Sequence, residues 1–353
     1  MDRFLESMRE QLGQWGTIAR GHAVRTENRL VGTVCDALPR EILAAFGVEA
    51  LRVPILVTEG GSTVSPEDRI AAALQICDCV IVPEGCAAYR PALELNTGRI
   101  IQFSHPHGYG EDAAIALHHS LDSLLQRLGF KNIDQMDPER LAIAVAKYDA
   151  VRRLARGIAS VRHTRRDALL PSNLMMVFEA AGALPPAVVT EALAGMLDAL
   201  NACPASDVAP VGRTVLVRGG LIRGADVLDD IERAGCVVSE DDSCNGRRQF
   251  DVSHNPASRN LYYEMLDALS YRPLCPSLRP PRERFDLFYR DLKNYGIGMV
   301  VFLRDTMDEI MLEEIESLRI RLMRTGVDPI VVDSEGAGRV LSAYLAATDT
   351  PSP

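Results

Sequence analysis

Three of the eight cysteines in this chain of 353 residues lie within one short stretch, at positions 77, 79 and 86. The stretch predicts a buried strand over 79–83, a Pro-Glu-Gly corner, and then a helix that Cys86 opens. A thiol between the carboxyl end of a strand and the amino end of a helix is favoured as thiolate, the form that reacts and binds metal. Open α/β sheets also hold their ligands at that edge. The stretch is therefore the first candidate for chemistry.

A second cysteine has the same kind of position. Cys35 follows a predicted strand at 29–34 and precedes a predicted helix at 39–46, so Cys35 and Cys86 are expected to open onto the same edge of one sheet. Convergent thiolates there indicate an iron–sulfur cluster, since zinc would want four ligands in closely spaced pairs. Cys77 and Cys79 are interpreted as small core residues, with Cys79 as a further candidate ligand.

Charged residues gather in the loop after a predicted strand at 236–239. This loop reads DDSCNGRR over 241–248. Two interpretations remain open. The acids and arginines either form an ion network that satisfies itself, or Arg247 or Arg248 faces an anionic ligand such as a phosphate or a thioester oxygen.

Three weaker patterns have plainer interpretations. Glycines at 219, 220 and 224 follow a strand but lack the spacing of a dinucleotide fingerprint, so they are a weak signal for phosphate. Histidines at 105, 107, 118 and 119 resemble metal ligands in composition only, because adjacent histidines on a helix point in different directions. The arginine-rich stretch 152–166 is typical of a solvated or interdomain helix face, with an anionic-ligand surface as the alternative.

Composition narrows the class of protein. The net charge is -10 and no basic stripe is interleaved with aromatic residues, which argues against nucleic-acid binding. No run approaches the roughly 18 apolar residues of a membrane span. The first residues are charged and lack an apolar signal region, so we expect a cytoplasmic protein whose cysteines stay reduced.

Alternating strands and helices predict the architecture. A first group of strands is expected at 29–34, 49–55, 79–83 and 99–103, and a second at 214–217, 236–239, 299–303 and 329–333. Short helices separate the strands of each group, which indicates βαβ units and parallel sheets. Long periodic segments between the two groups predict helices. The fold class expected is therefore α/β, with two Rossmann-like lobes of parallel sheet joined by a helical segment.

The predicted domains follow from this alternation of strands and helices. An N-terminal α/β lobe covers 1–110 and begins with one amphipathic helix and a polar connector over 1–28. A helical connecting region covers 111–203, and a linker rich in small residues and proline lies at 202–212. The C-terminal α/β lobe covers 204–347, and 348–353 is expected to be a disordered tail.

Several segments, in order, resemble one known family. The matching segments are 32–53 with Cys35 and Arg52, 80–86 with Cys86, 141–153, 231–238, and most clearly DDSCNGR over 241–247. Together they resemble the 2-hydroxyacyl-CoA dehydratase / benzoyl-CoA reductase subunit family over about residues 28–335.

The resemblance implies two similar subunits, each with two α/β lobes around a 4Fe–4S cluster held by three cysteines. It also implies an ATP-dependent activator protein that delivers one electron. The cluster passes this electron to the carbonyl of a CoA thioester, and the ketyl radical permits elimination of water or ring reduction. The expected partners are therefore a CoA-thioester substrate, a homologous second subunit in a heterodimer, and the activator, in anaerobic metabolism.

The sequence departs from this family at its ligand positions. Cys86 matches, but Ala87 follows it where the family has Asp, and the stretch 56–76 has no cysteine for the first ligand. Arg304 stands where the third cysteine is expected. A cluster here must recruit Cys35, Cys77, Cys79 or Cys244, or be absent. We predict Cys86, Cys35 and Cys79 as metal ligands, with Arg247 and Arg304 as anion contacts of the catalytic site.

Two functions of different class follow. The first is an enzyme subunit of a dehydratase- or reductase-type complex with a 4Fe–4S cluster. The second is a cluster-less paralogue that acts as a structural or regulatory subunit. A small-molecule-binding α/β protein is a third and weaker reading. The acyl group, the choice between dehydration and ring reduction, and homo- or hetero-oligomerisation are left open.

Overall fold

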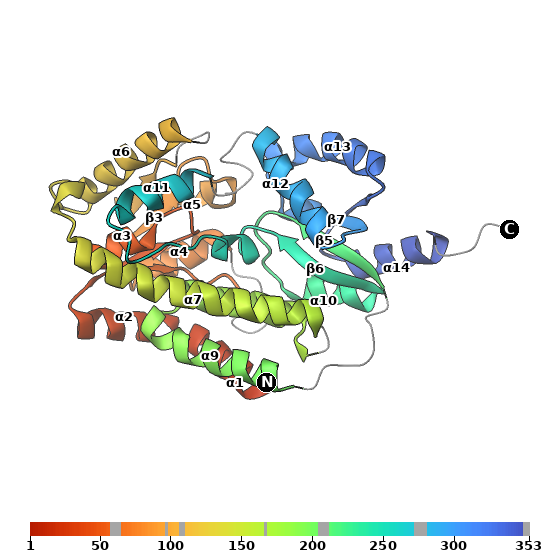
Figure 1. The fold of residues 1–353 in the computed structure, drawn as a ribbon, viewed down its shortest axis with the longest axis horizontal. Helices are drawn as coiled ribbons and strands as arrows, with labels where there is room; N and C mark the ends of the chain where they lie inside the picture. The colour runs from red at the N-terminus through yellow and green to blue at the C-terminus, as the bar shows by residue number, and fades with distance from the viewer. Residues whose placement is uncertain are drawn as a thin grey trace.

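The computed structural model describes residues 1–56, 65–95, 98–105, 110–165, 168–203, 212–271 and 281–348. Two four-stranded, all-parallel sheets form the two lobes (Figure 1). The first holds β1 (Arg29–Thr33), β2 (Val48–Arg52), β3 (Cys79–Pro83) and β4 (Ile100–Phe103) in the order β2-β1-β3-β4. The second holds β5 (Arg213–Arg218), β6 (Cys236–Asp242), β7 (Met299–Leu303) and β8 (Asp328–Val332) in the order β6-β5-β7-β8. The predicted α/β fold class with two parallel-sheet lobes is confirmed.

The first sheet is covered by α3 (Arg40–Ala45), α4 (Pro66–Leu74), the short η1 (Ala87–Tyr89) and α5 (Arg90–Leu93), and α6 (Glu111–Arg127). The central helices are α7 (Pro138–Thr164), α8 (Pro171–Ala183) and α9 (Pro186–Ala202), preceded by η2 (Ile133–Gln135). The second lobe has α10 (Asp226–Arg233), η4 (Arg247–Phe250), α12 (Pro281–Asn294), η6 (Arg304–Thr306), α13 (Glu309–Arg324) and α14 (Ala337–Thr348). Apolar clusters lie on both faces of each sheet, as a doubly wound sheet requires.

The N-terminal region differs from the prediction of one helix and a polar connector. It forms two helices, α1 (Asp2–Gly13) and α2 (Trp15–Thr26). The second helix buries Trp15, Ala19 and Ala23, a stripe made mostly of small residues that gives little periodic signal in the sequence. The Trp15 indole donates a hydrogen bond of 2.8 Å to the carbonyl of Ala183, which fixes α2 against α8.

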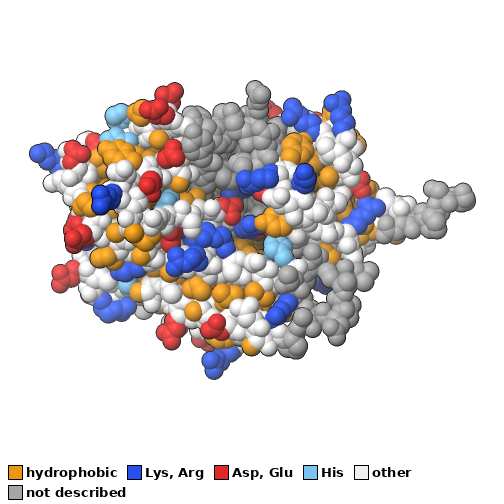
Figure 2. Space-filling view, viewed as in Figure 1, with side chains coloured by type: hydrophobic (Ala, Val, Ile, Leu, Met, Phe, Trp, Pro, Cys, Tyr) orange, Lys and Arg blue, Asp and Glu red, His pale blue; other side chains and the backbone are white. Residues whose placement is uncertain are grey.

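Helix α7 runs along both lobes (Figure 1). Its arginines tie the lobes together: Arg152 binds Glu41, Arg156 donates to the carbonyl of Phe250, and Arg162 binds Glu232. In Figure 2, Lys and Arg side chains gather near the middle of this face. Of the two interpretations of the arginine-rich stretch, these contacts favour the interdomain helix face.

One helix lies away from its neighbours in the sequence. Helix α11 (Leu261–Tyr271) follows β6 of the second sheet, yet it lies beside α6 of the first lobe (Figure 1). Its buried Leu261 and Met265 share a core with Leu117 and Leu121. The chain therefore crosses from the second lobe back to the first between β6 and α11. The crossing segment carries the motif that begins at Asp241.

Candidate functional site

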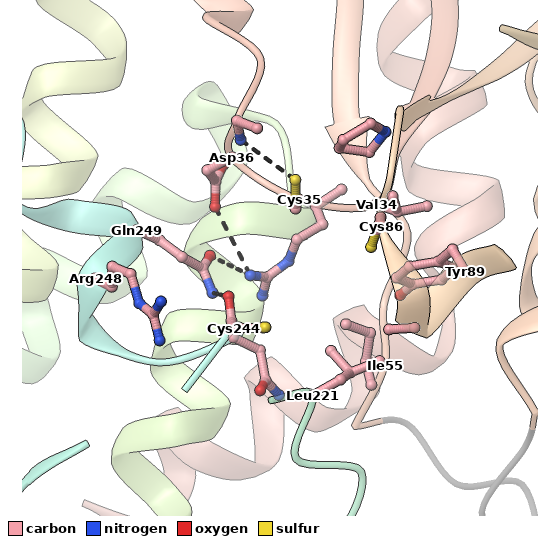
Figure 3. Close-up of a pocket in the computed structure, with 15 residues that line it drawn as sticks. Val34, Cys35, Asp36, Ile55, Cys86, Tyr89, Leu221, Cys244, Arg248 and Gln249 are labelled. Carbon is pink, nitrogen blue, oxygen red and sulfur yellow. Dashed lines mark hydrogen bonds and ion pairs between the residues drawn. The ribbon is translucent and has the colours of Figure 1, made fainter. Parts of the chain in front are cut away.

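A pocket lies where the loops after β1, β2 and β3 meet the loops after β5 and β6 (Figure 3). We call it the inner pocket. The empty space within it, open solvent included, amounts to about 670 Å³. Most of its walls are apolar, and they include Val34, Ile55, Pro83, Ala88, Tyr89 and Leu221. Because these residues come from both sheets, the pocket exists only when the two lobes are joined.

Three thiols line the inner pocket (Figure 3). Cys35 lies in the loop after β1 and Cys86 in the loop after β3, as the order of the strands requires. Cys244 joins them from the crossing segment of the second lobe. The sequence motif DDSCNGR contained this third thiol, but only the crossing of the chain brings it to the first lobe. Sequence reasoning therefore named Cys244 as an optional ligand and committed to Cys79.

The structure does not bring Cys79 to the pocket. Cys79 is the first residue of β3, and its side chain lies in the core beneath α6, 5 % exposed. Burial raises the pKa of its thiol to about 11. Cys77 is buried in the other core of the lobe, where burial raises its thiol pKa to about 12. The interpretation of both as small core residues fits these positions.

The helix expected after Cys86 is much shorter than predicted. Cys86 precedes the single turn of η1, and α5 follows with only four residues. Gly85 makes the corner with a φ of 78°, in the left-handed region that favours glycine. Since so short a helix carries little dipole, the predicted stabilisation of a Cys86 thiolate by a helix terminus lacks its structural basis.

Hydrogen bonds between residues of the same loop hold the loop that carries Cys244 in place. The Asp241 carboxylate accepts a hydrogen bond of 2.6 Å from the Ser243 hydroxyl and others from the backbone N–H groups of Ser243 and Arg247. A Cβ on Gly246 would lie 1.4 Å from Asp241 Oδ1, so only glycine allows the carboxylate this place. Burial raises the pKa of Asp241 to about 6, against the hydrogen bonds from Ser243 that lower it.

Backbone and amide contacts attach the same loop to the segment after β5. Cys244 N–H donates to the carbonyl of Gly220 at 2.9 Å. Asn245 is 1 % exposed, and its amide accepts from the N–H of Ile222 and donates to the Ile222 carbonyl. Its polar atoms are therefore used by the protein and not directed to a ligand. These contacts fix Cys244 relative to the second sheet.

A buried ion network fixes the loop relative to the first lobe. Arg52, 1 % exposed, binds the fully buried Glu179 of α8 at 2.6 Å. The same guanidinium donates to Gln249, whose amide in turn donates to the carbonyl of Cys244 at 3.3 Å. Asp36 lies between Arg40 at 3.1 Å and Arg52 at 3.9 Å. The charged side chains of the first lobe at the pocket are thus matched by opposite charges.

A larger outer pocket of about 1430 Å³ adjoins the inner one. Cys86, Ala88, Leu221 and Cys244 line both pockets, so two of the thiols stand at the boundary. The outer walls carry more polar residues, among them Glu67, Arg223, Asp305, Thr306, Ser334 and Glu335. The two pockets together form a cleft between the lobes, apolar at its inner end and polar at its outer end.

The sequence model of one family matches residues 35–339, most of the chain. That family is described as 2-hydroxyglutaryl-CoA dehydratase, D-component. The chain belongs to this dehydratase family. Membership supports a role as a subunit of a 2-hydroxyacyl-CoA dehydratase-type complex, in agreement with the resemblance noted in the sequence. No curated protein is found to match the chain.

The two arginines predicted as anion contacts of this dehydratase subunit do not line the inner pocket. Arg247 binds Glu240 and lies over the ring of Tyr295, beside a separate pocket of the second lobe. Arg304 is exposed and pairs with Asp333 at 2.5 Å. Arg248, the alternative of the sequence analysis, does line the inner pocket and binds Asp242 at 2.9 Å. Their role as anion contacts stays a prediction.

The glycines after β5 serve contact between loops. A Cβ on Gly220 would lie 1.9 Å from the carbonyl oxygen of Thr306, and the Gly220 N–H donates to the Thr306 hydroxyl at 3.0 Å. The backbone of this turn therefore packs against η6 and is hydrogen-bonded to it. Neighbouring protein thus accounts for Gly219 and Gly220, whereas a Cβ on Gly224 would meet nothing within 4 Å, and the weak phosphate signal gains no support.

Whether an iron–sulfur cluster fits can be tested on the donor set. Cys35, Cys86 and Cys244 supply three sulfur donors, the ligand type that such clusters prefer. Within the described part of the chain, no three His, Cys, Asp or Glu side chains are already gathered around one point. The donors therefore fit in kind, but the structure does not hold the three thiols as a ready ligand set.

Other predicted features fall partly outside the described residues, namely His107, Cys275, most of the 202–212 linker and the tail 349–353. His118 lies on α6, where its Nδ1 is 2.8 Å from the hydroxyl of Tyr262.

Among the helices that the structure describes, none is long and apolar enough to cross a membrane.

Proposed function

We propose that this dehydratase-family subunit holds an iron–sulfur cluster in the inner pocket, with Cys35, Cys86 and Cys244 as its ligands. One observation carries the proposal: thiols from three separate loops, contributed by both lobes, line a single pocket. Thiolate sulfur is the preferred ligand of such clusters. Cys244 takes the place that the sequence analysis gave to Cys79, because Cys79 faces a closed core.

The substrate in this proposal is a CoA thioester that enters by the outer pocket. The cluster, when bound, supplies one-electron transfer for the elimination of water or the reduction of a ring. A homologous second subunit and an ATP-dependent activator complete the complex. Family membership supports the thioester and the partner subunit, and the two-pocket cleft offers a place for the thioester.

A cluster-less subunit is the second candidate, and specific observations favour it. Arg304, which stands where the family has a cysteine, is paired with Asp333. The Sγ of Cys35 accepts a hydrogen bond of 3.4 Å from the N–H of Ala37. In this alternative the thiols are walls of a binding pocket, and the chain supports a catalytic partner.

Anaerobic purification and reconstitution with iron and sulfide distinguish the two candidates. The cluster proposal expects about four irons and matching acid-labile sulfide per chain, with charge-transfer absorption. Cys86→Ala, Cys35→Ala and Cys244→Ala should each lower the iron content severalfold. Cys203→Ser is the matched control, because Cys203 lies after α9 and does not line the pocket.

The variants also separate ligands from bystanders. Loss of iron in the three pocket variants but not in Cys203→Ser supports the proposal. Iron-free wild-type protein that still assembles with a family partner would instead establish the cluster-less role. Iron that survives Cys244→Ala but is lost in Cys79→Ala would contradict the ligand set and restore the set predicted from the sequence.

A further inference from the structure

The inner pocket contains a buried hydroxyl group, that of Tyr89. This residue ends η1, three residues after Cys86, and is 3 % exposed. It lines the inner pocket but not the outer one. Among the hydrogen bonds of the described residues, none involves its hydroxyl. A buried hydroxyl without an acceptor is costly, so this one calls for an acceptor inside the pocket.

The corner that carries Cys86 also directs Tyr89. The backbone N–H of Tyr89 donates to the carbonyl of Cys86 at 3.3 Å, so one tight turn presents both side chains. In Figure 3 they lie on the same side of the pocket, and the hydroxyl end of Tyr89 faces its interior. We infer that the Tyr89 hydroxyl donates a hydrogen bond to sulfur at the proposed cluster site, either to the Cys86 thiolate or to a sulfide beside it.

The inference rests on the proposed function and deepens it. The three thiols remain the ligands, and Tyr89 is added as a residue that retains the cluster and raises its reduction potential. Hydrogen bonds to the sulfur atoms are one of the factors that set the potential of such clusters. A bond from a hydroxyl to an ionised acceptor is also among the stronger hydrogen bonds in proteins.

Most other polar groups of the pocket are already bound within the protein. Asn245 is held by the backbone of the second lobe, and Gln249 accepts from Arg52 and donates to a backbone carbonyl. The Asp36 carboxylate lies between two arginines. The remaining walls are mostly apolar and offer a hydroxyl no acceptor. Sulfur is therefore the acceptor that the pocket offers to Tyr89.

Burial keeps the Tyr89 phenol protonated. It raises the pKa of this group far above the ordinary value of 10, and negative charge at Cys86, Glu179 and Cys35 adds to the rise, against Arg52. The group therefore donates a hydrogen bond and does not ionise. A reduced cluster carries one more negative charge than an oxidised one, so the bond is stronger to the reduced form and makes the reduction potential less negative.

Tyr89→Phe removes the hydroxyl and keeps the ring. Tyr148→Phe is the matched control, because Tyr148 is 5 % exposed, its hydroxyl also lacks a hydrogen-bond partner among the described residues, and it does not line the inner pocket. Both full-length variants are reconstituted anaerobically with iron and sulfide. We expect iron to pass to a chelator about tenfold faster from Tyr89→Phe than from wild type, and at the wild-type rate from Tyr148→Phe.

The reduction potential gives a second measurement on the same samples. Titration with dithionite is followed by electron paramagnetic resonance. At the wild-type midpoint potential, the ratio of reduced to oxidised cluster should be severalfold lower in Tyr89→Phe and unchanged in Tyr148→Phe.

Iron-free samples separate this role from folding. Without the cluster the hydroxyl has no acceptor, so its removal should not lower the unfolding free energy of Tyr89→Phe, measured by urea denaturation. A loss of stability in iron-free Tyr89→Phe would assign the hydroxyl to the fold and overturn the inference.

The remaining outcomes separate the inference from the function beneath it. Faster iron release and a lower reduced fraction in Tyr89→Phe alone support it. Iron release and potential unchanged in Tyr89→Phe, or changed equally in both variants, overturn it and leave the cluster in place. Wild-type protein that binds no iron overturns the proposed function, and the inference falls with it because the sulfur acceptor is then missing.

Discussion

The two lobes share one topology and use its ligand-binding edge differently. In each sheet the second strand lies outside the first, so the loops after the first and third strands flank the crevice where α/β sheets bind ligands. Cys35 lies two residues after the end of β1, and Gly220 lies at the corresponding position after β5. Cys86 lies three residues after the end of β3, and Thr306 lies at the corresponding position after β7.

The difference between these paired positions explains where the site lies. In the second lobe Gly220 and Thr306 touch, so the two loops are held together, and both residues line the outer pocket. In the first lobe Cys35 and Cys86 leave the crevice open as the inner pocket. The second lobe then contributes through its crossing segment, which brings Cys244. One lobe provides the opening and the other provides a wall and a third thiol.

Removing the charge that joins the lobes should have the largest effect. Arg52 ends β2 and connects Glu179 of α8 to Gln249 of the crossing segment. Arg52→Met should lower the free energy of unfolding by about 3 to 5 kcal/mol, because it leaves a buried carboxylate without its cation. Urea denaturation followed by circular dichroism measures this loss.

Arg304→Met is the control for Arg52→Met. It removes an arginine–aspartate pair of similar geometry from the surface of the second lobe, where solvent screens the charges. We expect the unfolding free energy to change little. Equal losses in the two variants would show that the buried network does not join the lobes.

Forcing apart the two touching loops of the second lobe should matter more than changing the thiol of the first lobe. Gly220→Ala places a Cβ 1.9 Å from the carbonyl oxygen of Thr306, so the loops after β5 and β7 must separate. We expect a loss of about 3 kcal/mol or more. Cys35→Ala, at the paired position of the first lobe, should cost less than about 1 kcal/mol. Thermal unfolding of the two variants gives the comparison, and a similar cost would contradict the difference between the lobes.

Periodicity in the sequence was sufficient for most of the fold. The buried strands and the helices between them carry strong local signals, such as Ser65 before Pro66, whose hydroxyl caps α4. The two sheets were therefore predicted with correct strands. Helix α2 was missed because its buried face is largely alanine. The side of the molecule to which α11 belongs depends on tertiary packing, which no local pattern contains.

The site was predictable only where strand order determines it. Cys35 and Cys86 follow two strands that pair directly, so their loops lie side by side in any such sheet. Cys79 was overrated because a thiol near others in the sequence was taken as a thiol near them in space. Cys244 was underrated for the opposite reason: 158 residues separate it from Cys86, and only the crossing segment brings the two to one pocket.

The smallest expected effect concerns Asp241, whose carboxylate accepts the hydrogen bonds that hold the crossing segment. The pKa of Asp241, about 6 because of burial, lies above the ordinary value of 3.8, so the folded protein holds this proton more tightly than the unfolded chain. The stability that the proton contributes is fully present below about pH 3.8 and is lost as the pH rises through about 6. Between pH 4.5 and 7.5, the unfolding free energy should fall by about 2 kcal/mol through this group.

Asp241→Asn isolates that contribution, because the amide keeps an acceptor for the Ser243 hydroxyl and does not titrate. The difference in unfolding free energy between wild type and variant should change by about 2 kcal/mol over the same pH range. A difference that stays constant would mean that Asp241 is ionised throughout and that Ser243 and the backbone N–H groups outweigh its burial. In either case Gly246 leaves the carboxylate its place, and the hydrogen bonds that Asp241 accepts hold the loop that presents Cys244.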